Sequence, residues 1–489
     1  MDWKSLIDEN SLAKLLPDAY SAYCRPLRDA LALFLKGISP RRQEKIAIEQ
    51  AAFPQTASLL DRLLLLARSS PVLHKLGQTL ARDRNLSIDL RKRLQYLEYL
   101  PPSVQFEEVE SVLVKQHGPL QRLGIALLQP LLAEASVAIV VPFRFSNGNL
   151  PVDGVFKVLK PGIKERLEEE LSILDRVGSY LDQCCTGLQI PHIAYRDTFE
   201  LVRDKLRYEV RLDEEQKNMA LAREFHKMDS RILIPAVFPD LSTPRITAME
   251  YVRGLKVTEF SSSFTNEKQR MAGLVIEALV ARPIFSKSPK AIFHADPHAG
   301  NLFSTRDYRL AVLDWSLTGS LSDRERISIM GIITGAITFN IEKIVSELSG
   351  LATRKPPEAH LLQSVVSKWI GRGSSDCLPG FTWLKGLMDE AVLNAGLSFS
   401  SDLMLFRKAL HMIDGVVADI GGTKELFDQV LLREFVLHFC AEWPWRFLQP
   451  WESRRPSTRI SNADLVELSL SLLLRPIRFW LERGMVSQN

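Results

Sequence analysis

The segment 292–316 constrains this chain more than any other part of its sequence. It reads IFHADPHAGNLFSTRDYRLAVLDWS, the pattern H-x-D-x-x-x-x-N followed by an apolar run that ends in an aspartate. Phosphoryl transfer needs one carboxylate that orients or deprotonates the attacking hydroxyl, and an amide oxygen and a second carboxylate that hold Mg²⁺. Asp296, Asn301 and Asp314 fill these roles in order. A strand, a turn and a second strand would return both metal ligands to one place, so the segment predicts a site for Mg²⁺ and a nucleotide.

Two other interpretations of this segment stay open. His294, Asp296 and His298 alternate along one extended stretch and could together ligate a metal ion. That interpretation leaves Asn301 and Asp314 without a role, and no cysteine or further histidine cluster follows. A lone aspartate near an asparagine is most often a capped turn, so only the compound pattern favours phosphoryl transfer.

A kinase-type site also needs a cation for the phosphates and a carboxylate that positions this cation. Lys157 lies in the apolar run VFKVLK, Glu215 lies in a later helical stretch, and Glu209 is a second candidate. A lysine on a strand is usually just solvated, so Lys157 means little without the catalytic segment. The connection ITAMEYVRG is expected to receive adenine on its backbone, at Glu250, Tyr251 and Val252.

The order of hydrophobic patterns predicts an α+β chain with two lobes. Two apolar runs around the turn cluster SNGNLPVDG predict a β-hairpin whose second strand ends at Pro161. Helical spacing at 164–181 and 206–228 alternates with strand-like runs at 232–239 and 245–252. We therefore expect a helical N-terminal extension over 1–130, a small β-rich lobe with inserted helices over 131–254, and a mostly helical large lobe with a helical tail over 255–489.

The composition of the chain indicates its protein class and its compartment. With 489 residues, 46 % of them hydrophobic and 25 % charged, the chain is typical of globular proteins, and its net charge of +4 gives no reason to expect nucleic acid. Five cysteines without a paired spacing predict reduced thiols in a cytoplasmic compartment. We expect no secretion signal and no transmembrane helix, because polar residues interrupt even the most apolar stretch, 126–143.

No glycine-rich phosphate loop precedes Lys157; an alanine-rich segment, LLAEASVAIVV, stands in its place. With this substitution the chain resembles the UbiB (AarF) family of atypical kinase-like ATPases. That family has an alanine-rich loop, a strand lysine before Pro-Gly, as in VFKVLKPGI, and a catalytic loop HADPHPGN, here HADPHAGN. The loop residues that match are Ala133, Ala135, Ser136 and Ala138.

Further motifs carry the resemblance from about residue 71 to 330. The family's K-x-G-Q signature appears as Lys75-Leu76-Gly77-Gln78, and its E-x-D motif with the following Glu and Asn would align with Glu209, Glu215 and Asn218. There are three departures. Arg211 replaces the Asp of E-x-D, Glu134 and Ile139 change the alanine-rich loop, and Trp315-Ser316 follows Asp314 in place of Phe-Gly.

The resemblance implies a bilobal protein-kinase-like fold that binds ATP or ADP with Mg²⁺. It implies ATP hydrolysis, or phosphorylation of a small or lipid-like molecule, in support of isoprenoid-quinone or lipid biosynthesis. Lys75 and Gln78, with Glu209, are expected to regulate the site by occluding it from protein substrates. The Asp-Trp pair also fits small-molecule phosphotransferases of the aminoglycoside and choline kinase type. A nucleotide-binding pseudokinase scaffold is the non-enzymatic alternative, against which the retained Asp296 argues.

Residues 320–489 carry no recognisable catalytic motif, and the chain's tryptophans gather there. The segment 465–484 combines leucines with three arginines, so it fits either an anionic membrane surface or a last helix that closes the large lobe. Peripheral attachment to the inner face of a membrane is therefore an expectation for this tail. Tryptophans in helical stretches are expected in the core.

Overall fold

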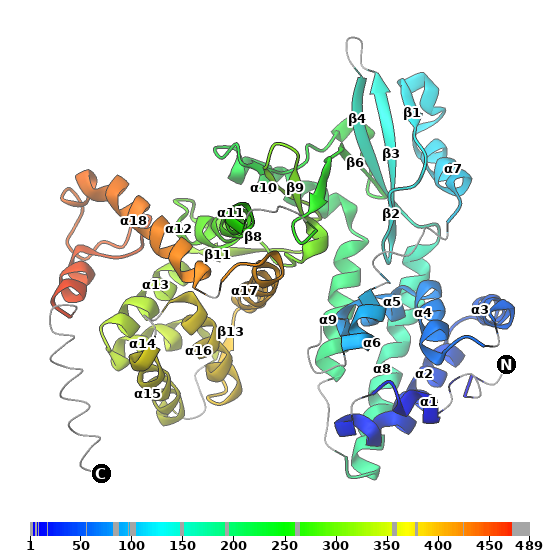
Figure 1. Cartoon of the computed structure of the whole chain (residues 1–489), viewed down its shortest axis with the longest axis horizontal. Helices are drawn as coiled ribbons and strands as arrows, with labels where there is room; N and C mark the ends of the chain where they lie inside the picture. The colour runs from blue at the N-terminus through cyan, green and yellow to red at the C-terminus, as the bar shows by residue number, and fades with distance from the viewer. Residues whose placement is uncertain are drawn as a thin grey trace. The chain divides into compact units, whose positions relative to one another are not determined.

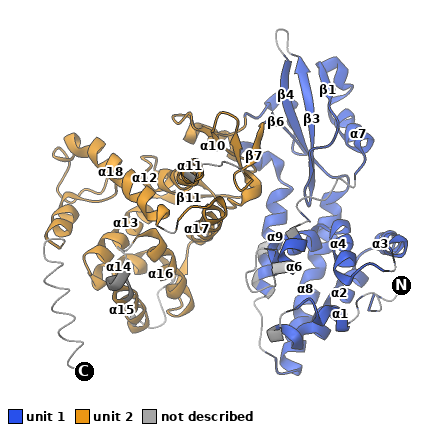
Figure 2. Ribbon diagram, viewed as in Figure 1, with its two compact units in different colours: residues 1–217, 236–251 blue, residues 218–235, 252–489 orange. Residues whose placement is uncertain are grey.

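The structure is a computed structural model. It describes residues 3–4, 7, 9–16, 18–54, 56–81, 88–95, 97, 104–146, 151–190, 195–259, 265–354, 359–376, 380–423 and 425–471. The chain forms two compact units: the first consists of residues 1–217 and 236–251, the second of residues 218–235 and 252–489 (Figure 2). The three-part division expected above stays a prediction.

The first unit combines a helical array with an antiparallel sheet (Figure 1). Its helices are α1 (Glu9–Ala13), α2 (Cys24–Gly37), α3 (Pro40–Ala52), α4 (Leu59–Ser69), α5 (Pro71–Leu80), α6 (Ile88–Gln95), α7 (Phe106–His117), α8 (Ile163–Gly187) and α9 (Tyr195–Glu209). Its strands are β1 (Ile125–Leu127), β2 (Ala133–Glu134), β3 (Ala138–Ser146), β4 (Pro151–Leu159) and β6 (Ile246–Glu250), in the order β1-β3-β4-β6 with β2 beside β3.

The expected β-hairpin is present as β3 and β4. Phe143 and Phe156 stack across the hairpin with ring centroids 4.2 Å apart. Gly154 makes room for this pair, because a Cβ atom on it would lie 2.4 Å from the Phe143 ring. Side chains from Gly154 to Leu159 are buried on both faces of β4, so a lysine in this strand is withdrawn from water.

The second unit is mostly helical. Its helices are α11 (Thr265–Ile276), α12 (Arg282–Phe285), α13 (Asp323–Ile337), α14 (Ile341–Leu351), α15 (Ala359–Asp376), α16 (Phe381–Leu393), α17 (Ser401–Ile420) and α18 (Leu426–Arg446), and a π-helical turn, Glu277–Ala281, joins α11 to α12. Its strands are β5 (Ile232–Leu233), β7 (Gly254–Lys256), β8 (Lys290–His294), β9 (Leu302–Thr305), β10 (Leu310–Val312), β11 (Thr318–Ser322), β12 (Ala352–Arg354) and β13 (Ser398–Phe399).

Three small sheets organise the second unit. One has the strand order β5-β10-β9-β7, and the others are the pairs β11-β8 and β12-β13. Helix α10 (Leu212–His226) begins in the first unit and ends in the second, since the boundary falls after Lys217. The α+β kinase-like fold class is confirmed, and no helix of the described residues is long and apolar enough to cross a membrane.

Two local expectations are wrong in detail. The stretch 206–228, expected as one helix, is broken between α9 and α10, where Val210 and Arg211 leave the helical path. The stretch 232–239 is a strand only over Ile232–Leu233, with one isolated pairing between Val237 and Met249. Pro235 has no N–H to donate to a ladder, which explains why the strand ends so early.

Candidate functional site

In the first unit, the structure joins Lys157 to Glu215. Lys157 lies on the central strand β4, opposite Val140 of β3 and Thr247 of β6. Its Nζ donates to both carboxylate oxygens of Glu215, at 2.7 and 2.9 Å, and both side chains are almost fully buried. Glu215 lies in the first turn of α10. A buried ammonium fixed by one carboxylate is the arrangement that presents a cation to phosphates.

Glu209 does not hold Lys157 but connects two other elements of the first unit. Its carboxylate accepts a hydrogen bond from the Nζ of Lys75 on α5, and another from the hydroxyl of Ser136 at 2.7 Å. Ser136 follows β2 in the alanine-rich loop and is buried. The K-x-G-Q helix and the alanine-rich loop therefore share one carboxylate. Arg211 instead pairs with Glu214, at 3.2 Å.

Sequence reasoning missed the residues that hold α5 in place. Glu170 of α8, which is fully buried, accepts hydrogen bonds from the hydroxyl of Ser70 and the backbone N–H of Val72, at 2.7 and 3.0 Å. Arg42 forms an ion pair with Glu170 and contacts Glu169 at 2.7 Å. These bonds satisfy the free N–H groups at the start of α5. Within the run EEEL nothing distinguishes Glu170, so no sequence signal could have identified it.

The other predicted residues of the first unit lie in the alanine-rich loop and on α5. Ala133 and Glu134 form β2, and the N–H of Ala135 donates to the carbonyl of Ala138 at 2.8 Å, so the alanine-rich segment is a tight turn. Gln78 is half-buried on α5. Gly77 packs against Leu97, whose side chain lies 2.4 Å from the position a Cβ would take.

The expected adenine-binding segment is only partly open to a ligand. The N–H of Glu250 donates to the carbonyl of Ala236 at 2.8 Å, and that of Tyr251 donates to Asp153 at 3.2 Å. Both donors are therefore engaged within the protein. Among the described residues, the N–H of Val252 has no such backbone partner, so it is the donor of this segment that an adenine could use.

In the second unit, the catalytic segment follows β8 and returns through β9 and β10. The side-chain amide of Asn301 donates to the backbone carbonyl of Asp296 at 3.2 Å. The backbone carbonyl of Asn301 accepts from the N–H of Leu313 at 2.8 Å, immediately before Asp314. The strand–turn–strand path therefore brings the backbones of all three predicted residues together.

His294 connects the two aspartates. Its Nδ1 accepts from the N–H of Asp296 at 3.2 Å, and its Nε2 lies 3.0 Å from the carbonyl of Leu313. Since Nδ1 accepts, Nε2 carries the proton and donates. Burial lowers the pKa of His294 and keeps the ring neutral. Both nitrogens are thus occupied by backbone groups, which contradicts the interpretation of His294 as a metal ligand.

Asp314 has an unusual backbone. Its φ is +54°, in the left-handed region that aspartate tolerates better than most residues, and such strain often marks functional positions. Trp315, fully buried, donates from its indole N–H to the carbonyl of Val312 at 3.1 Å. Asn218 of α10 donates to the backbone carbonyl of Trp315 at 3.0 Å. Side-chain bonds on both sides therefore hold the Asp314 turn.

The donor set of this turn fits Mg²⁺. A carboxylate and an amide oxygen are hard ligands, which Mg²⁺ prefers together with water and phosphate oxygens. Asn301 uses its amide nitrogen for Asp296, so the hydrogen bond orients the side chain and leaves the oxygen end of the amide for a cation. No group of three His, Cys, Asp or Glu side chains in the described part of the chain is arranged to hold a metal ion without phosphate.

Comparison with known protein families identifies the family to which this chain belongs. Residues 100–348 match the family described as "ABC1 atypical kinase-like domain". The chain belongs to this family. The predicted resemblance to UbiB is confirmed, since homologues carry UbiB and ABC1-kinase names.

Two relatives illustrate the range of this ABC1 family. The "Probable protein kinase UbiB" of Marinobacter nauticus is 27 % identical over 450 residues, which cover 86 % of this chain and 78 % of that protein. "Protein ACTIVITY OF BC1 COMPLEX KINASE 1, chloroplastic" of Arabidopsis thaliana is 23 % identical over 367 residues, which cover 72 % of this chain and 52 % of the relative. The chain thus spans about half the length of that Arabidopsis relative. A solved complex of Rv3197 with erythromycin from Mycobacterium tuberculosis aligns with 65 % of this chain and 80 % of its own, at 17 % identity and a TM-score of 0.49.

Two buried histidines make this ABC1-family chain sensitive to acid. Burial, reinforced by Lys160, lowers the pKa of His74 to about 4, and burial, reinforced by Arg282, lowers that of His226 to about 3. An unfolded histidine titrates near pH ~6.5, so below that pH the unfolded chain binds protons that the folded chain excludes. The stability is complete above pH ~6.5 and is lost as the pH falls toward the folded values. We expect each histidine to remove about 2 kcal/mol between pH 7 and pH 5.

Urea unfolding at both pH values measures this loss. His74→Gln and His226→Gln should each reduce the difference between the two midpoints. Leu393→Ser, a change at an exposed residue that does not titrate, should leave the difference as it is in the wild type. An undiminished difference in both buried-site variants would contradict the prediction.

Proposed function

We propose that this chain binds Mg-ATP and either hydrolyses it or transfers its γ-phosphate to a small or lipid-like molecule. The observation that carries the proposal is the hydrogen-bonded loop in which His294 fixes the backbones that carry Asp296 and Asp314. Family membership supports it. A role in isoprenoid-quinone or lipid biosynthesis is the biological setting that the resemblance to UbiB favours.

Each residue of the site has a role in this proposal. Lys157, held by Glu215, contacts the nucleotide phosphates, and Val252 with its neighbours receives adenine. Asp296 orients the attacking hydroxyl or water and accepts its proton. Asn301 and Asp314 hold Mg²⁺, which when bound neutralises charge on the phosphates. Asn301 also keeps the Asp296 backbone fixed through the amide bond described above.

In this proposal the K-x-G-Q helix, α5, regulates access to the nucleotide site. Glu209 accepts bonds from Lys75 and from Ser136, so one carboxylate joins α5 to the alanine-rich loop. With Gln78 on the same helix, this piece excludes a protein substrate and leaves access to small acceptors. Strong phosphorylation of a generic protein by the purified wild type would contradict this part.

Phosphate release from Mg-ATP by the purified full chain is the test of the function. Mg²⁺-dependent turnover supports an ATPase or phosphotransferase. Tight nucleotide binding without turnover, alone or with lipid, would favour the pseudokinase alternative. Absence of nucleotide binding would overturn the proposal as a whole.

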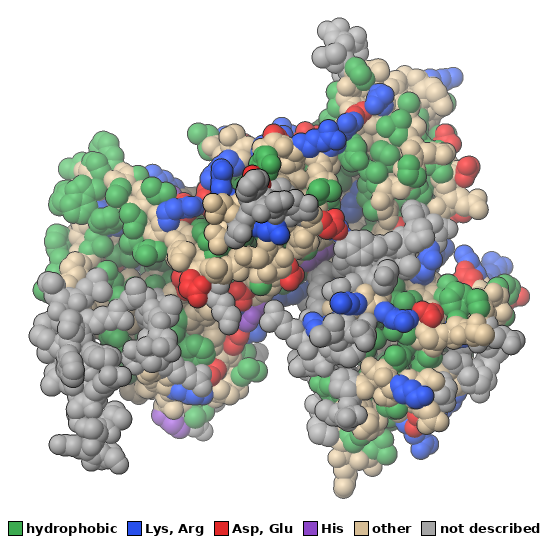
Figure 3. Space-filling model, in the orientation of Figure 1, with side chains coloured by type: hydrophobic (Ala, Val, Ile, Leu, Met, Phe, Trp, Pro, Cys, Tyr) green, Lys and Arg blue, Asp and Glu red, His purple; other side chains and the backbone are tan. Residues whose placement is uncertain are grey.

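We also propose that the protein works peripherally at the inner, cytoplasmic face of a membrane. The support is an exposed aromatic ridge on α18 and the chain after it, visible as the hydrophobic cluster at the upper left of Figure 3. Its side chains are between half and three-quarters exposed: Trp443, Trp445, Phe447, Leu448 and Trp451. This corrects the expectation that tryptophans in helices lie in the core, which holds for Trp383 but not for Trp443 and Trp445.

The ridge is ordered along the helix. Phe435, Phe439, Trp443 and Phe447 follow one another at four-residue spacing, with centroid separations of 6.2, 5.4 and 5.3 Å. Exposed tryptophans and leucines in one patch are typical of segments that enter the interfacial layer of a bilayer. The expected membrane-binding tail 465–484 lies outside the described residues from 472 onward, so it remains a prediction beside the ridge.

Flotation with vesicles tests the ridge. We expect the wild type to float with vesicles of phosphatidylcholine and phosphatidylglycerol, and the triple variant Trp443→Ser/Trp445→Ser/Phe447→Ser to lose at least tenfold in the bound fraction. A matched variant at scattered exposed apolar sites, Ile48→Ser/Leu255→Ser/Leu393→Ser, should float like the wild type. Equal flotation of both variants would contradict the proposal, and a wild-type dimer dispersed by the triple variant would assign the ridge to a second copy instead.

A further inference from the structure

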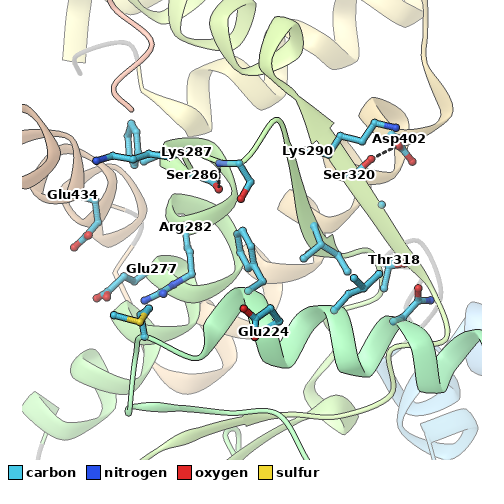
Figure 4. A pocket seen from close by; sticks show the side chains of 18 of the residues that line it. Glu224, Glu277, Arg282, Ser286, Lys287, Lys290, Thr318, Ser320, Asp402 and Glu434 are labelled. Atoms are coloured by element: carbon cyan, nitrogen blue, oxygen red, sulfur yellow. Dashed lines mark hydrogen bonds between the residues drawn. The ribbon is translucent and has the colours of Figure 1, made fainter. Parts of the chain in front are cut away.

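The second unit contains a cavity of about 1010 Å³ that the phosphoryl-transfer residues do not use (Figure 4). Its walls come from the second half of α10, from α12 and the loop after it, from β8 and β11, and from α18. The volume is at the upper end of the range for sites that bind organic molecules, about 300–1,000 Å³. The cavity therefore has room for an organic ligand of drug size.

One side of the cavity is apolar. Its apolar lining residues are Leu221, Phe225 and Met228, which lie on or just after α10, Phe285 of α12 and Ile292 of β8. Leu221 is 60 % exposed and Met228 is 86 % exposed. An apolar ligand body would cover both side chains and gain about 25 cal/mol for each Å² removed from water.

The loop after α12 and the start of β8 carry positive charge. Lys287 lies in the loop between α12 and β8, which also brings the serines Ser286 and Ser288 to the cavity, and Lys290 is the first residue of β8. Both lysines are exposed, and neither has a carboxylate partner among the described residues. Lysines beside hydroxyl groups are suited to an anionic head group.

Three of the four acidic residues of the lining do not offset these lysines, because each of the three already pairs with a cation. Glu277 is bound by Arg231 and Arg433, and Glu434 is bound by Arg433. Glu224 pairs with Lys227, and Asp402 accepts from the Ser320 hydroxyl at 3.0 Å. Asp402 keeps its charge, because its partner is a neutral hydroxyl, so the two lysines outnumber the one carboxylate of the lining that no described cation offsets.

Two buried arginines hold the backbone of the lysine-bearing loop. Arg326, fully buried, donates to the backbone carbonyl of Ser286 at 2.8 Å and also contacts that of Ser288. Arg459, also buried, donates to the Ser286 carbonyl at 2.7 Å. Two buried guanidinium groups therefore hold the loop in place before any ligand arrives, which lowers the entropy cost of binding.

We propose that this cavity binds an amphipathic anion, with its apolar body against Phe225 and Phe285 and its anionic head at Lys287 and Lys290. The site is separate from the residues assigned to the nucleotide, and binding there needs no nucleotide. It shares walls with the catalytic loop, however. Asn218, which holds the Trp315 carbonyl, lines the cavity, and Thr318 of β11 pairs with His294 in register.

Occupancy should therefore change the rate of phosphate release, and this part of the inference rests on the proposed function. A ligand that orders Asn218 and β11 orders the turn of Asp314 at the same time. The direct measurement of binding does not depend on that step.

The test uses 8-anilino-1-naphthalenesulfonate, which has an aromatic body and a sulfonate head, with the full chain and without nucleotide. We expect saturable fluorescence, with Kd raised at least tenfold in Lys287→Glu/Lys290→Glu. The control Arg270→Glu/Lys368→Glu makes the same change of charge elsewhere in the second unit and should keep the wild-type Kd. The α18 triple variant removes signal from the exposed ridge, and the lysine-dependent component should remain in it.

The results of binding and of phosphate release test separate parts of this inference. A lysine-dependent Kd in both the wild type and the ridge variant supports the cavity site. Equal Kd values in the lysine variant and its control overturn it, as does the loss of all saturable signal in the ridge variant. If the probe binds as expected but leaves phosphate release unchanged in an active protein, the binding site stands and the coupling to the Asp314 turn is wrong. A protein without turnover under any condition would count against the proposed function and not against the site.

Discussion

Asp296→Asn should lower the rate of phosphate release from Mg-ATP by a factor of about 10²–10⁴ and leave nucleotide affinity within about threefold of the wild type. The substitution keeps the size of the side chain and removes the base. It also keeps the backbone carbonyl that Asn301 holds and the N–H that donates to His294. The loop should therefore stay folded, and the loss should appear in kcat.

Asp314→Asn should behave differently, because this residue is proposed to hold the metal ion. We expect turnover to fall at least as far, together with a loss of the Mg²⁺-dependent part of nucleotide affinity, while affinity measured in EDTA stays as in the wild type. Calorimetric titration with and without Mg²⁺ separates the two variants. Identical effects on kcat and on Mg²⁺-dependent affinity in both would refute the division of roles.

Asp307→Asn is the matched control for both aspartates. Asp307 lies in the turn between β9 and β10, its side chain is 60 % exposed, and it pairs with Arg309 at 2.6 Å. The amide oxygen of an asparagine can still accept from the Thr305 hydroxyl, which now donates at 2.6 Å. This variant should turn over at the wild-type rate, and a comparable loss in it would indicate damage to the hairpin and not to catalysis.

Lys157→Met should remove most turnover and also destabilise the protein. Its partner Glu215 is almost fully buried, so the substitution leaves a carboxylate without compensation, which costs about 3–5 kcal/mol. The double variant Lys157→Met/Glu215→Leu replaces the pair with apolar groups and should recover most of the stability. It should not recover turnover, because the cation for the phosphates is still missing. Urea midpoints and phosphate release on the same preparations measure both effects.

Lys343→Met is the control for this experiment. Lys343 pairs with Asp464 and Glu467, both at 2.9 Å, and is largely buried. Its loss should lower the urea midpoint without lowering kcat. Recovery of turnover in the double variant at Lys157 and Glu215 would show that the pair serves folding alone.

The order of the elements could be read from the sequence because it depends on local patterns. The β3–β4 hairpin follows from two apolar runs around an Asn-Gly turn, and α8 from the helical spacing at 164–181. The break between α9 and α10 was missed, because 206–228 keeps its helical spacing across Arg211. The early end of β5 was also missed. The apolar run 232–239 predicts a longer strand, and a single residue in it, Pro235, ends the strand.

The catalytic segment was also accessible from the sequence. Asp296, Asn301 and Asp314 lie within one short stretch, so covalent connection and two short strands bring them together with little help from the rest of the chain. The pairing of Lys157 with Glu215 was a choice between two glutamates, and the structure gives Glu209 to Lys75 and Ser136. That choice depends on how α9 and α10 are oriented, which spacing alone does not fix.

The sequence by itself determined the family, the type of fold and the short-range chemistry, because motifs and hydrophobic periods are local properties. Tertiary structure alone decided which distant groups meet: Glu170 at the start of α5, and Arg326 under the loop of Lys287. It also decided that Trp443 and Trp445 face outward and that α10, α12, β8, β11 and α18 enclose a cavity. The physical reason is that burial and long-range pairing depend on the packing of whole elements, and residues of the same type are interchangeable in a pattern until that packing selects one of them.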